Sequence, residues 1–264
     1  MPPTVPAAFD LTGQVALVTG SSSDIGIGFA TARLLGQLGA SVMVTGTTDR
    51  AAERAAELEQ EGIAAASHIA DLFDPVAARQ LVQATETTLG PVDILVNNAG
   101  LASVNSPEQP NPLMSMTDDE WSLVLRRNVD SAFFVTRAAL PAMVERGYGR
   151  IINVASTAGI VTAYTGDVGY HTAKAAMLGM TRSVAVDFAT NGITANVVLP
   201  GWIATAAQLP SEVAAGNATP IGRSATAAEV GSAIAYLASP GASYVTGTTL
   251  LIDGANSIAG ARIA

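Results

Sequence analysis

Residues 14–39, QVALVTGSSSDIGIGFATARLLGQLG, contain the change from strand to helix that decides the fold. Residues 14–20 are largely aliphatic and end in a glycine, which predicts a buried strand. Residues 29–39 carry apolar side chains at helical spacing and end in Gly39, which predicts an amphipathic helix. A glycine-rich turn between a strand and a helix lets backbone N–H groups approach a pyrophosphate at the positive end of the helix. The stretch therefore predicts a strand–turn–helix unit suited to a phosphate-containing ligand.

The remainder of the chain repeats this alternation of short β-branched runs and longer alanine-rich segments. Further strands are predicted over residues 41–46, 64–71, 92–100, 149–156, 193–201 and 246–254, and further helices over 49–62, 75–90, 117–146, 169–190 and 227–238. Alternating strands and helices are typical of a parallel sheet with right-handed crossovers. We therefore expect one α/β domain over residues 1–264, a Rossmann-type doubly wound sheet of about seven strands with helices on both faces. Residues 1–8 are expected to form a loose arm and residues 257–264 a C-terminal tail.

Composition and charge exclude several classes of function. The chain has 264 residues, no cysteine and two histidines, so disulfide scaffolds, thiolate nucleophiles and three-histidine zinc sites are excluded, and we predict no metal site. A net charge of −9 argues against binding to nucleic acids or anionic membranes, which requires a basic surface. The first residues lack the pattern of a signal peptide, and a cytoplasmic location is expected.

A set of short motifs makes the chain resemble the short-chain dehydrogenase/reductase family from about Phe9 to Gly254. The motifs are TG…GIG (19–28), NNAG (97–100), Asn128, Ser156, YHTAK (170–174), PGWIAT (200–205) and DGA (253–255). The resemblance implies hydride transfer between a nicotinamide cofactor and an alcohol or carbonyl compound. It also implies a homotetramer, in which residue 257 onward could reach a neighbouring subunit.

Tyr170 and Lys174 lie four residues apart on a predicted helix, so both side chains fall on one face. A phenol has a pKa near 10, and a neighbouring ammonium group favours its ionised form, which lowers the barrier to proton transfer. The resemblance implies that Tyr170 is the general acid/base, that Lys174 also binds the nicotinamide ribose, and that Ser156 binds the substrate oxygen, with Thr157 as the alternative. It further implies that Asn128 anchors a water molecule. Enoyl reductases of this family space their tyrosine and lysine more widely.

The glycine turn departs from the family pattern, because five residues instead of three separate Gly20 from the next glycine. Gly26 and Gly28 correspond to the last two family glycines in one alignment, and Asp24 replaces a glycine in the other. In either alignment Asp24 lies near the expected pyrophosphate, where its carboxylate would repel the ligand unless it turns away to cap the helix. The residues expected to contact the cofactor here are Gly20, Ser22, Ser23, Asp24, Ile25, Gly26, Ile27 and Gly28.

The choice between NADP and NAD is usually made at the end of the second strand, where an acidic residue binds the ribose 2′-hydroxyl of NAD. Gly46 occupies this position, followed by Thr47, Thr48 and Arg50, which favours NADP(H); Asp49 keeps NAD(H) as the alternative. The resemblance adds further cofactor contacts at Asp71, Leu72, Asn98, Ala99, Gly100, Pro200, Gly201, Ile203 and Thr205, besides Tyr170 and Lys174.

Substrate selection is expected in the loop over residues 101–116 and in a lid over residues 202–219, whose apolar residues favour an apolar ketone substrate. The main interpretation is an NADP(H)-dependent carbonyl reductase or alcohol dehydrogenase acting on a small molecule. One alternative is a 3-oxoacyl-carrier-protein reductase, which would need a basic surface, with Arg126, Arg127 and Arg137 as candidates. The other is a noncatalytic NADP-binding sensor, which would not need the tyrosine–lysine pair.

Overall fold

The computed structural model describes residues 5–100, 112–206 and 208–260, in which seven parallel strands form one sheet. The strands are β1 (Val15–Val18), β2 (Ser41–Gly46), β3 (Ala65–Ile69), β4 (Ile94–Asn97), β5 (Gly149–Val154), β6 (Ile193–Pro200) and β9 (Thr249–Ile252). Their order is β3-β2-β1-β4-β5-β6-β9, so the direction of winding reverses between β1 and β4. Ligands of doubly wound sheets bind outside the carboxyl ends of the strands at such a reversal. The predicted Rossmann-type fold is confirmed.

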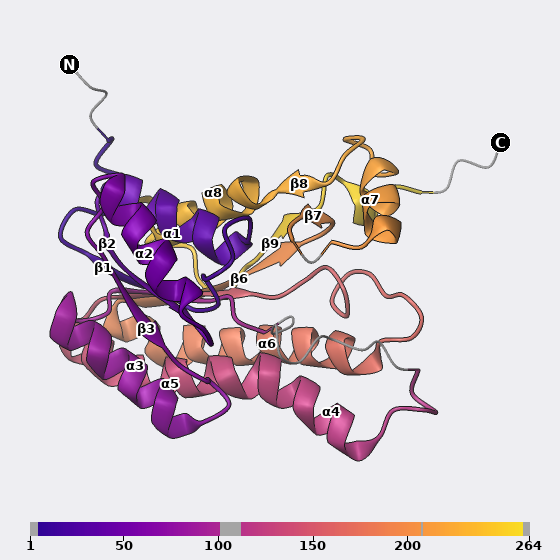
Figure 1. The fold of residues 1–264 in the computed structure, drawn as a ribbon, viewed down its shortest axis with the longest axis horizontal. Coiled ribbons are helices and arrows are strands. Elements are labelled where there is room, and N and C mark those ends of the chain that lie inside the picture. The colour runs from indigo at the N-terminus through magenta and orange to yellow at the C-terminus, as the bar shows by residue number, and fades with distance from the viewer. Residues whose placement is uncertain (1–4, 101–111, 207, 261–264) are drawn as a thin grey trace.

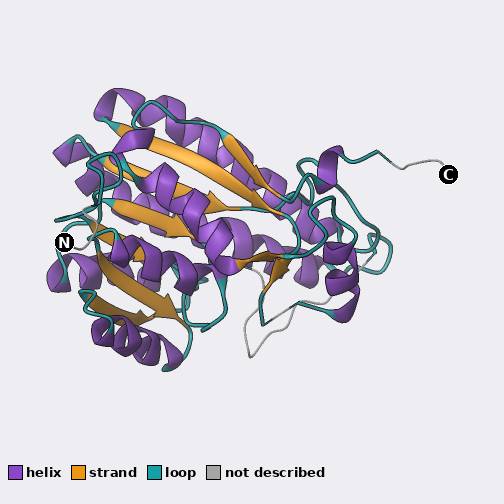
Figure 2. Ribbon diagram, turned by 90° about the horizontal axis from the view of Figure 1, so that it is seen from above, coloured by secondary structure: helices purple, strands orange, loops and turns teal. Residues whose placement is uncertain are grey.

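Helices cover both faces of this sheet (Figure 1). One layer contains α1 (Ile27–Gln37), α2 (Arg50–Gln60) and α8 (Ala227–Ala238), and the other contains α3 (Pro75–Thr88), α5 (Ser131–Arg146) and α6 (Val168–Phe188). Each layer has its own hydrophobic core, with Phe29 and Leu35 in the first and Leu81 and Met143 in the second. Figure 2 shows the twist of the sheet between the two layers. Short 3-10 turns follow at η2 (Ala189–Asn191), η3 (Pro240–Ala242) and η4 (Asn256–Ile258).

The long helix expected over residues 117–146 is divided in the structure. Helix α4 (Asp118–Leu125) begins with a capping box of Thr117 and Glu120, a π-helical turn η1 (Arg126–Asp130) follows, and α5 continues to Arg146. A π turn widens the helix by one residue and is frequent at functional sites. The periodicity of apolar residues predicted the length of the segment but not this interruption.

The predicted lid contains structure of its own. Within residues 202–219 lie β7 (Ile203–Ala204) and α7 (Pro210–Asn217), and β7 pairs with β8 (Ala225–Thr226) in a separate two-stranded parallel sheet. Two-residue strands have no sequence period, so neither β7 nor β8 was predicted. The loop expected over 101–116 falls largely outside the described residues.

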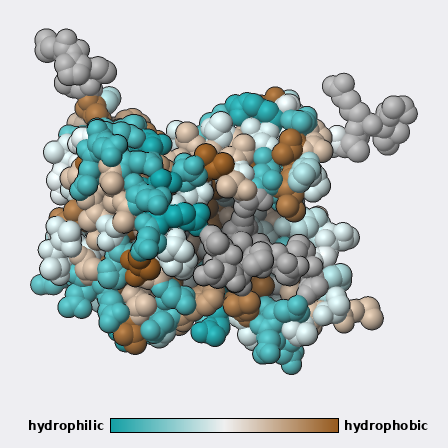
Figure 3. All heavy atoms as spheres, viewed as in Figure 1, coloured by the Kyte–Doolittle hydropathy of each residue, from teal (hydrophilic) through white to brown (hydrophobic). Residues whose placement is uncertain are grey.

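The surface in Figure 3 mixes hydrophilic and hydrophobic residues, with the hydrophobic ones in scattered patches. Within the described part of the chain, none of the helices has the length and apolar character needed to cross a membrane. The same residues contain no group of three or more potential metal ligands.

Candidate active site

Tyr170 and Lys174 lie in the first two turns of α6 and are almost fully buried, with exposed fractions of 8% and 4%. The Lys174 Nζ atom lies 5.4 Å from the centre of the Tyr170 ring and donates a hydrogen bond of 3.2 Å to the carbonyl of Val154. Val154 is the last residue of β5, so this bond fixes the ammonium group at the carboxyl end of the sheet. A buried cation beside a phenol favours the phenolate, as the expected role of Tyr170 requires.

Ser156 lies two residues after Val154, the end of β5 to which Lys174 is bonded. Its Oγ atom accepts a hydrogen bond of 3.1 Å from the backbone N–H of Ala158. The alternative residue, Thr157, is buried, and its N–H donates to the carbonyl of Pro200 at the end of β6. Ser156 is the more exposed of the two hydroxyl residues, which supports it as the substrate-facing one.

Asn128 lies at the centre of the π turn and is completely buried. Its Nδ2 group donates to the carbonyl of Val124 at 3.1 Å, while its Oδ1 atom has no hydrogen-bond donor among the described residues. A Cβ atom on Gly100 would lie 2.7 Å from this Oδ1, so the end of the NNAG turn packs directly against it. A buried acceptor of this kind is a suitable position for an ordered water. The role of Asn128 as a water anchor stays a prediction.

The glycine turn packs closely against the NNAG turn. Asn98 Nδ2 donates to the carbonyls of Thr19 and Gly20 at 3.1 and 2.9 Å, and Thr19 Oγ1 accepts from the N–H groups of Asn98 and Ala99. A Cβ atom on Gly28 would lie 2.6 Å from both Asn98 Nδ2 and the Gly20 carbonyl oxygen, so only glycine fits there.

Helix α1 begins at Ile27 with Gly26 as its N-cap residue, which favours the alignment of Gly26 and Gly28 with the last two glycines of the family. Asp24 does not cap this helix, which is the arrangement that would have turned its carboxylate away from the pyrophosphate. Its side chain accepts from the adjacent Ile25 N–H at 3.0 Å, and the helix has neither a side-chain cap nor an acidic residue in its first turn. The first backbone N–H groups therefore lack competing side-chain acceptors, an arrangement that fits a bound phosphate. Ser22 and Ser23 lie in the preceding turn.

The end of β2 lies against this turn. A Cβ atom on Gly46 would lie 2.5 Å from Ser22 Oγ and 2.7 Å from Ser22 Cβ, so Ser22 occupies the space of a side chain at this position. Thr47 and Arg50 are exposed, and Arg50 Nε donates weakly to Thr48 Oγ1 at 3.4 Å. Asp49, the residue that keeps NAD(H) as the alternative, is exposed at the N-cap position of α2.

At the end of β3, Asp71 accepts from the Phe73 N–H at 3.1 Å, while Leu72 is buried. At the end of β6, the Gly201 N–H donates to the Ile252 carbonyl, which aligns Pro200 and Gly201 with β9, and Ile203 is buried in β7 ahead of Thr205.

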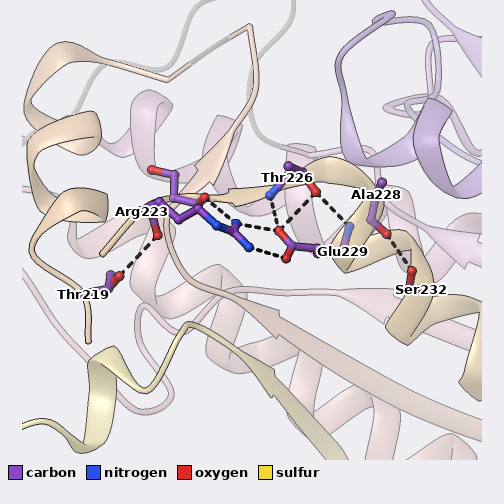
Figure 4. Close-up of polar contacts among 7 residues, drawn as sticks. Thr219, Arg223, Thr226, Ala228, Glu229 and Ser232 are labelled. Carbon is purple, nitrogen blue, oxygen red and sulfur yellow. Dashed lines mark hydrogen bonds and ion pairs between the residues drawn. The ribbon is translucent and has the colours of Figure 1, made fainter. Parts of the chain in front are cut away.

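An ion pair joins Arg223, four residues after the predicted lid, to Glu229 of α8 (Figure 4). The guanidinium of Arg223 donates to both carboxylate oxygens of Glu229 at 2.8 and 2.7 Å, and Glu229 also completes a capping box with Thr226. The hydrogen bonds from Arg223 and from the Thr226 backbone lower the pKa of Glu229 to about 2. Trp202 and Asp253 line a cavity beside this pair.

Two residues near Tyr170 were not identified as functional from the sequence. Asp167 is the N-cap of α6, and its buried carboxylate accepts from the Tyr170 N–H at 3.3 Å. Burial raises the pKa of Asp167, opposed by that bond and by a hydrogen bond from the Tyr164 side chain. His171 was expected to be exposed or packed, and it is packed against Tyr164 with ring centres 4.4 Å apart. An aspartate three residues before the tyrosine is the signal that could have indicated this cap.

The three arginines expected to form a basic surface do not lie together on the surface. Arg127 is buried in the π turn, because the extra residue turns it inward. Arg126 and Arg137 are exposed and stack on aromatic rings, Arg126 on Phe73 and Arg137 on Phe133. Of the three, Arg126 and Arg137 stay candidates for contact with an acidic partner.

Comparisons with known proteins agree with this geometry. A family model described as "Enoyl-(Acyl carrier protein) reductase" matches residues 20–255. The 3-oxoacyl-[acyl-carrier-protein] reductases of Haemophilus influenzae and Vibrio cholerae are each 38% identical to this chain; the first alignment covers 92% of this chain and 98% of the relative, and the second 93% and 98%.

Solved structures show the same likeness. A gluconate 5-dehydrogenase from Burkholderia cenocepacia, solved in complex with NADP and tartrate, has a TM-score of 0.88 and 32% identity over 96% of this chain and 99% of its own. A putative gluconate dehydrogenase from Agrobacterium tumefaciens has a TM-score of 0.89 and 30% identity, covering 97% of this chain and 100% of its own. The chain belongs to the short-chain dehydrogenase/reductase family of oxidoreductases.

Proposed function

We propose that this chain reduces a 3-oxoacyl thioester to the 3-hydroxyacyl thioester with NADPH. The observation that carries the proposal is the placement of Tyr170, Lys174 and Ser156 at the carboxyl end of β5, in a chain that matches 3-oxoacyl reductases over 92% of its length. These relatives favour the 3-oxoacyl reaction over that of an unspecialised carbonyl reductase. The spacing of four between Tyr170 and Lys174 favours it over enoyl reduction.

The chain's own residues perform the proton chemistry. The Tyr170 phenol donates its proton to the substrate carbonyl oxygen, and the Lys174 ammonium group, fixed by its bond to Val154, stabilises the phenolate that remains. Ser156 Oγ donates a hydrogen bond to the same oxygen and stabilises the charge that develops there. A water on Asn128 Oδ1 would supply the replacement proton. When bound, the nicotinamide supplies the hydride.

Gly46, Thr47, Thr48 and Arg50 support NADPH as the cofactor. Gly46 ends β2 at the position where a carboxylate would repel a 2′-phosphate, and Arg50 is exposed four residues further along the chain. The uncapped N-terminus of α1 would hold the pyrophosphate, and Lys174 the nicotinamide ribose. Two structural neighbours are described with bound NADP, which supports the same choice.

Oxidation of a sugar acid is the second candidate. The structural neighbours named gluconate dehydrogenases cover nearly the whole chain, and the same residues can run the reaction in reverse, with Tyr170 accepting the proton of an alcohol.

Nicotinamide absorbance tests both candidates. Wild-type protein is assayed with NADPH or NADH plus acetoacetyl-CoA or an acetoacetyl carrier protein, and with NADP plus gluconate. We expect NADPH consumption with the thioesters, and a loss of about 10²–10⁴-fold in kcat for Tyr170→Phe with NADPH binding retained. NADPH binding without turnover of any substrate would favour the noncatalytic sensor.

The carrier itself is tested separately. If an acidic carrier docks on η1 and α5, Arg126→Glu with Arg137→Glu will lower turnover of the carrier-bound substrate and leave turnover of the free thioester unchanged. Equal turnover of both substrates in this variant would point to a small thioester as the substrate.

A further inference from the structure

The loop over residues 157–167 connects Ser156 to the helix that carries Tyr170. Its first limb is a compact turn, in which the Thr157 carbonyl accepts from the N–H groups of residues 160–162 and the Gly159 N–H donates to the Thr162 carbonyl. Its second limb ends at Asp167, the cap of α6. The loop exposes about half of each of two large side chains, with fractions of 49% for Val161 and 47% for Tyr164. Because both ends of the loop lie at catalytic residues, its position affects the shape of the substrate site.

His171, one residue after Tyr170, contacts both limbs of this loop. A Cβ atom on Gly159 would lie 2.1 Å from the His171 carbonyl oxygen, so the first limb lies directly on the His171 backbone. The Tyr164 N–H in the second limb donates to His171 Nε2 at 3.2 Å, and the two rings meet edge to face. His171 Nδ1 lies 2.5 Å from the Asp167 carbonyl oxygen.

These contacts fix the tautomer of the imidazole. Nε2 faces an N–H donor and must offer its lone pair, while Nδ1 faces a carbonyl oxygen and must carry the hydrogen. A neutral histidine protonated on Nδ1 satisfies both partners at once. Gln can replace the acceptor at the Nε2 position and Asn the donor at the Nδ1 position, but neither spans both.

We propose that His171 is a positioning residue for the substrate, a latch that holds the 157–167 loop against the start of α6 so that the loop forms one wall of the substrate site. This inference rests on the proposed function of that site for its kinetic consequence, but the latch itself is a property of the loop. The side chain acts through Tyr164 and Asp167 and takes no part in proton transfer, because adjacent residues on a helix point about 100 degrees apart.

Three variants separate the contacts of the imidazole. His171→Phe keeps the ring against Tyr164 and removes both hydrogen bonds, His171→Gln keeps the acceptor, and His171→Asn keeps the donor. His68→Phe is the matched control, because His68 lies on β3, away from the loop.

The first readout is hydrogen exchange at the Tyr164 amide, which requires no substrate. We expect exchange to become about tenfold faster in His171→Phe and His171→Asn, since each leaves this N–H without its acceptor, and to stay close to wild type in His171→Gln and His68→Phe. An exchange rate in His171→Phe equal to that of the wild type would refute the proposed positioning role of His171. Equal exchange rates in His171→Gln and His171→Phe would refute it as well.

The second readout is kinetic. For acetoacetyl-CoA we expect His171→Phe to raise KM about tenfold while kcat and the Kd for NADPH change by roughly twofold or less. In His171→Gln, KM should stay close to the wild-type value. A parallel loss of NADPH binding and of melting temperature would show a general structural role and overturn the proposal. If the wild type turns over no substrate, the proposed function fails. The exchange rates still test whether His171 holds the 157–167 loop.

Discussion

Replacing Asn153 by alanine removes the centre of a buried polar network behind the active site. Asn153, on β5, is paired in register with Asn97 on β4 and accepts from Asn97 Nδ2 at 2.8 Å. Its own Nδ2 donates to Thr181 Oγ1 on α6 at 2.8 Å, and Asn97 Nδ2 also donates to Thr136 Oγ1 on α5 at 2.9 Å. All four side chains are buried, so water cannot replace a lost partner.

The expected cost follows from these contacts. Asn153→Ala leaves one N–H of Asn97 and one acceptor site on Thr181 without partners. Each buried polar group without a hydrogen bond lowers the free energy of unfolding by about 1–3 kcal/mol, and the cavity lowers it further. A total of about 4 kcal/mol is expected, which lowers the melting temperature of a protein of this size by roughly 8–16 °C. The loss is measured by circular dichroism during a thermal scan at fixed protein concentration.

A second pair of variants separates hydrogen bonding from packing. Asn153→Leu keeps most of the volume, and Thr181→Val removes the hydroxyl whose acceptor site would otherwise be unpaired. The double variant should therefore be more stable than the sum of the two single changes implies. A melting temperature of Asn153→Ala within about 2 °C of wild type would refute the reasoning, because it would mean that the network contributes almost nothing.

Three further predictions test the cofactor site, the ion pair and the assembly. Gly46→Asp should weaken NADPH binding by at least about tenfold through charge repulsion, without improving NADH binding. Adding Ser22→Gly should relieve the steric conflict with the new side chain and improve NADH binding. Titration of intrinsic fluorescence measures the affinity for each cofactor. Glu229 has a pKa of about 2, below the usual value of a glutamate. Its ion pair with Arg223 therefore stabilises the fold at pH values above the ordinary pKa of a glutamate, and this stabilisation is lost as the pH falls towards 2. Thermal scans should therefore show Glu229→Gln less stable than wild type near neutral pH and equal to it near pH 2. β9 pairs only with β6 among the described strands, so its free edge is expected to lie in a tetramer interface. Replacing the exposed Leu251 of β9 by lysine should therefore yield smaller species in light scattering. A monomeric wild type would contradict this expectation.

Five of the seven strands of the main sheet were predictable as short runs of mostly buried residues with turn residues beyond them. The two edge strands, β3 and β9, have no fully buried residue and were predicted from the alternation of strands and helices. β2 and the helix α8 have the predicted bounds, and the other strands are shorter than predicted by one to five residues. The extra predicted residues lie mostly at carboxyl ends, as in the NNAG segment. There Asn98 and Ala99 leave the sheet to contact the glycine turn, and Gly100 packs against Asn128. Backbone that leaves a sheet for a binding site keeps the composition of a strand, so the pattern cannot show where pairing stops.

The π turn at Arg126–Asp130 could not be predicted, because one extra residue in a helix leaves its composition unchanged. Its effect on the site is large. The turn directs both Arg127 and Asn128 into the interior, whereas an uninterrupted helix would present adjacent residues about 100 degrees apart. The same feature therefore explains why Asn128 reaches Gly100 and why the predicted basic surface lacks Arg127.

The relation between Ser22 and Gly46 shows how a longer turn changes the meaning of a single position. From the sequence, glycine at the end of β2 indicates only that no carboxylate is available for NAD. In the structure, the side chain of Ser22 fills the space beside Gly46, so any larger residue there requires Ser22 to move. Ser22 belongs to the segment between Gly20 and Gly26, which is two residues longer than in the family pattern. This segment places Ser22 against the end of β2, where Ser21 also bonds to Thr45. We therefore expect cofactor preference in this chain to depend on the length of the turn as well as on the residue at position 46.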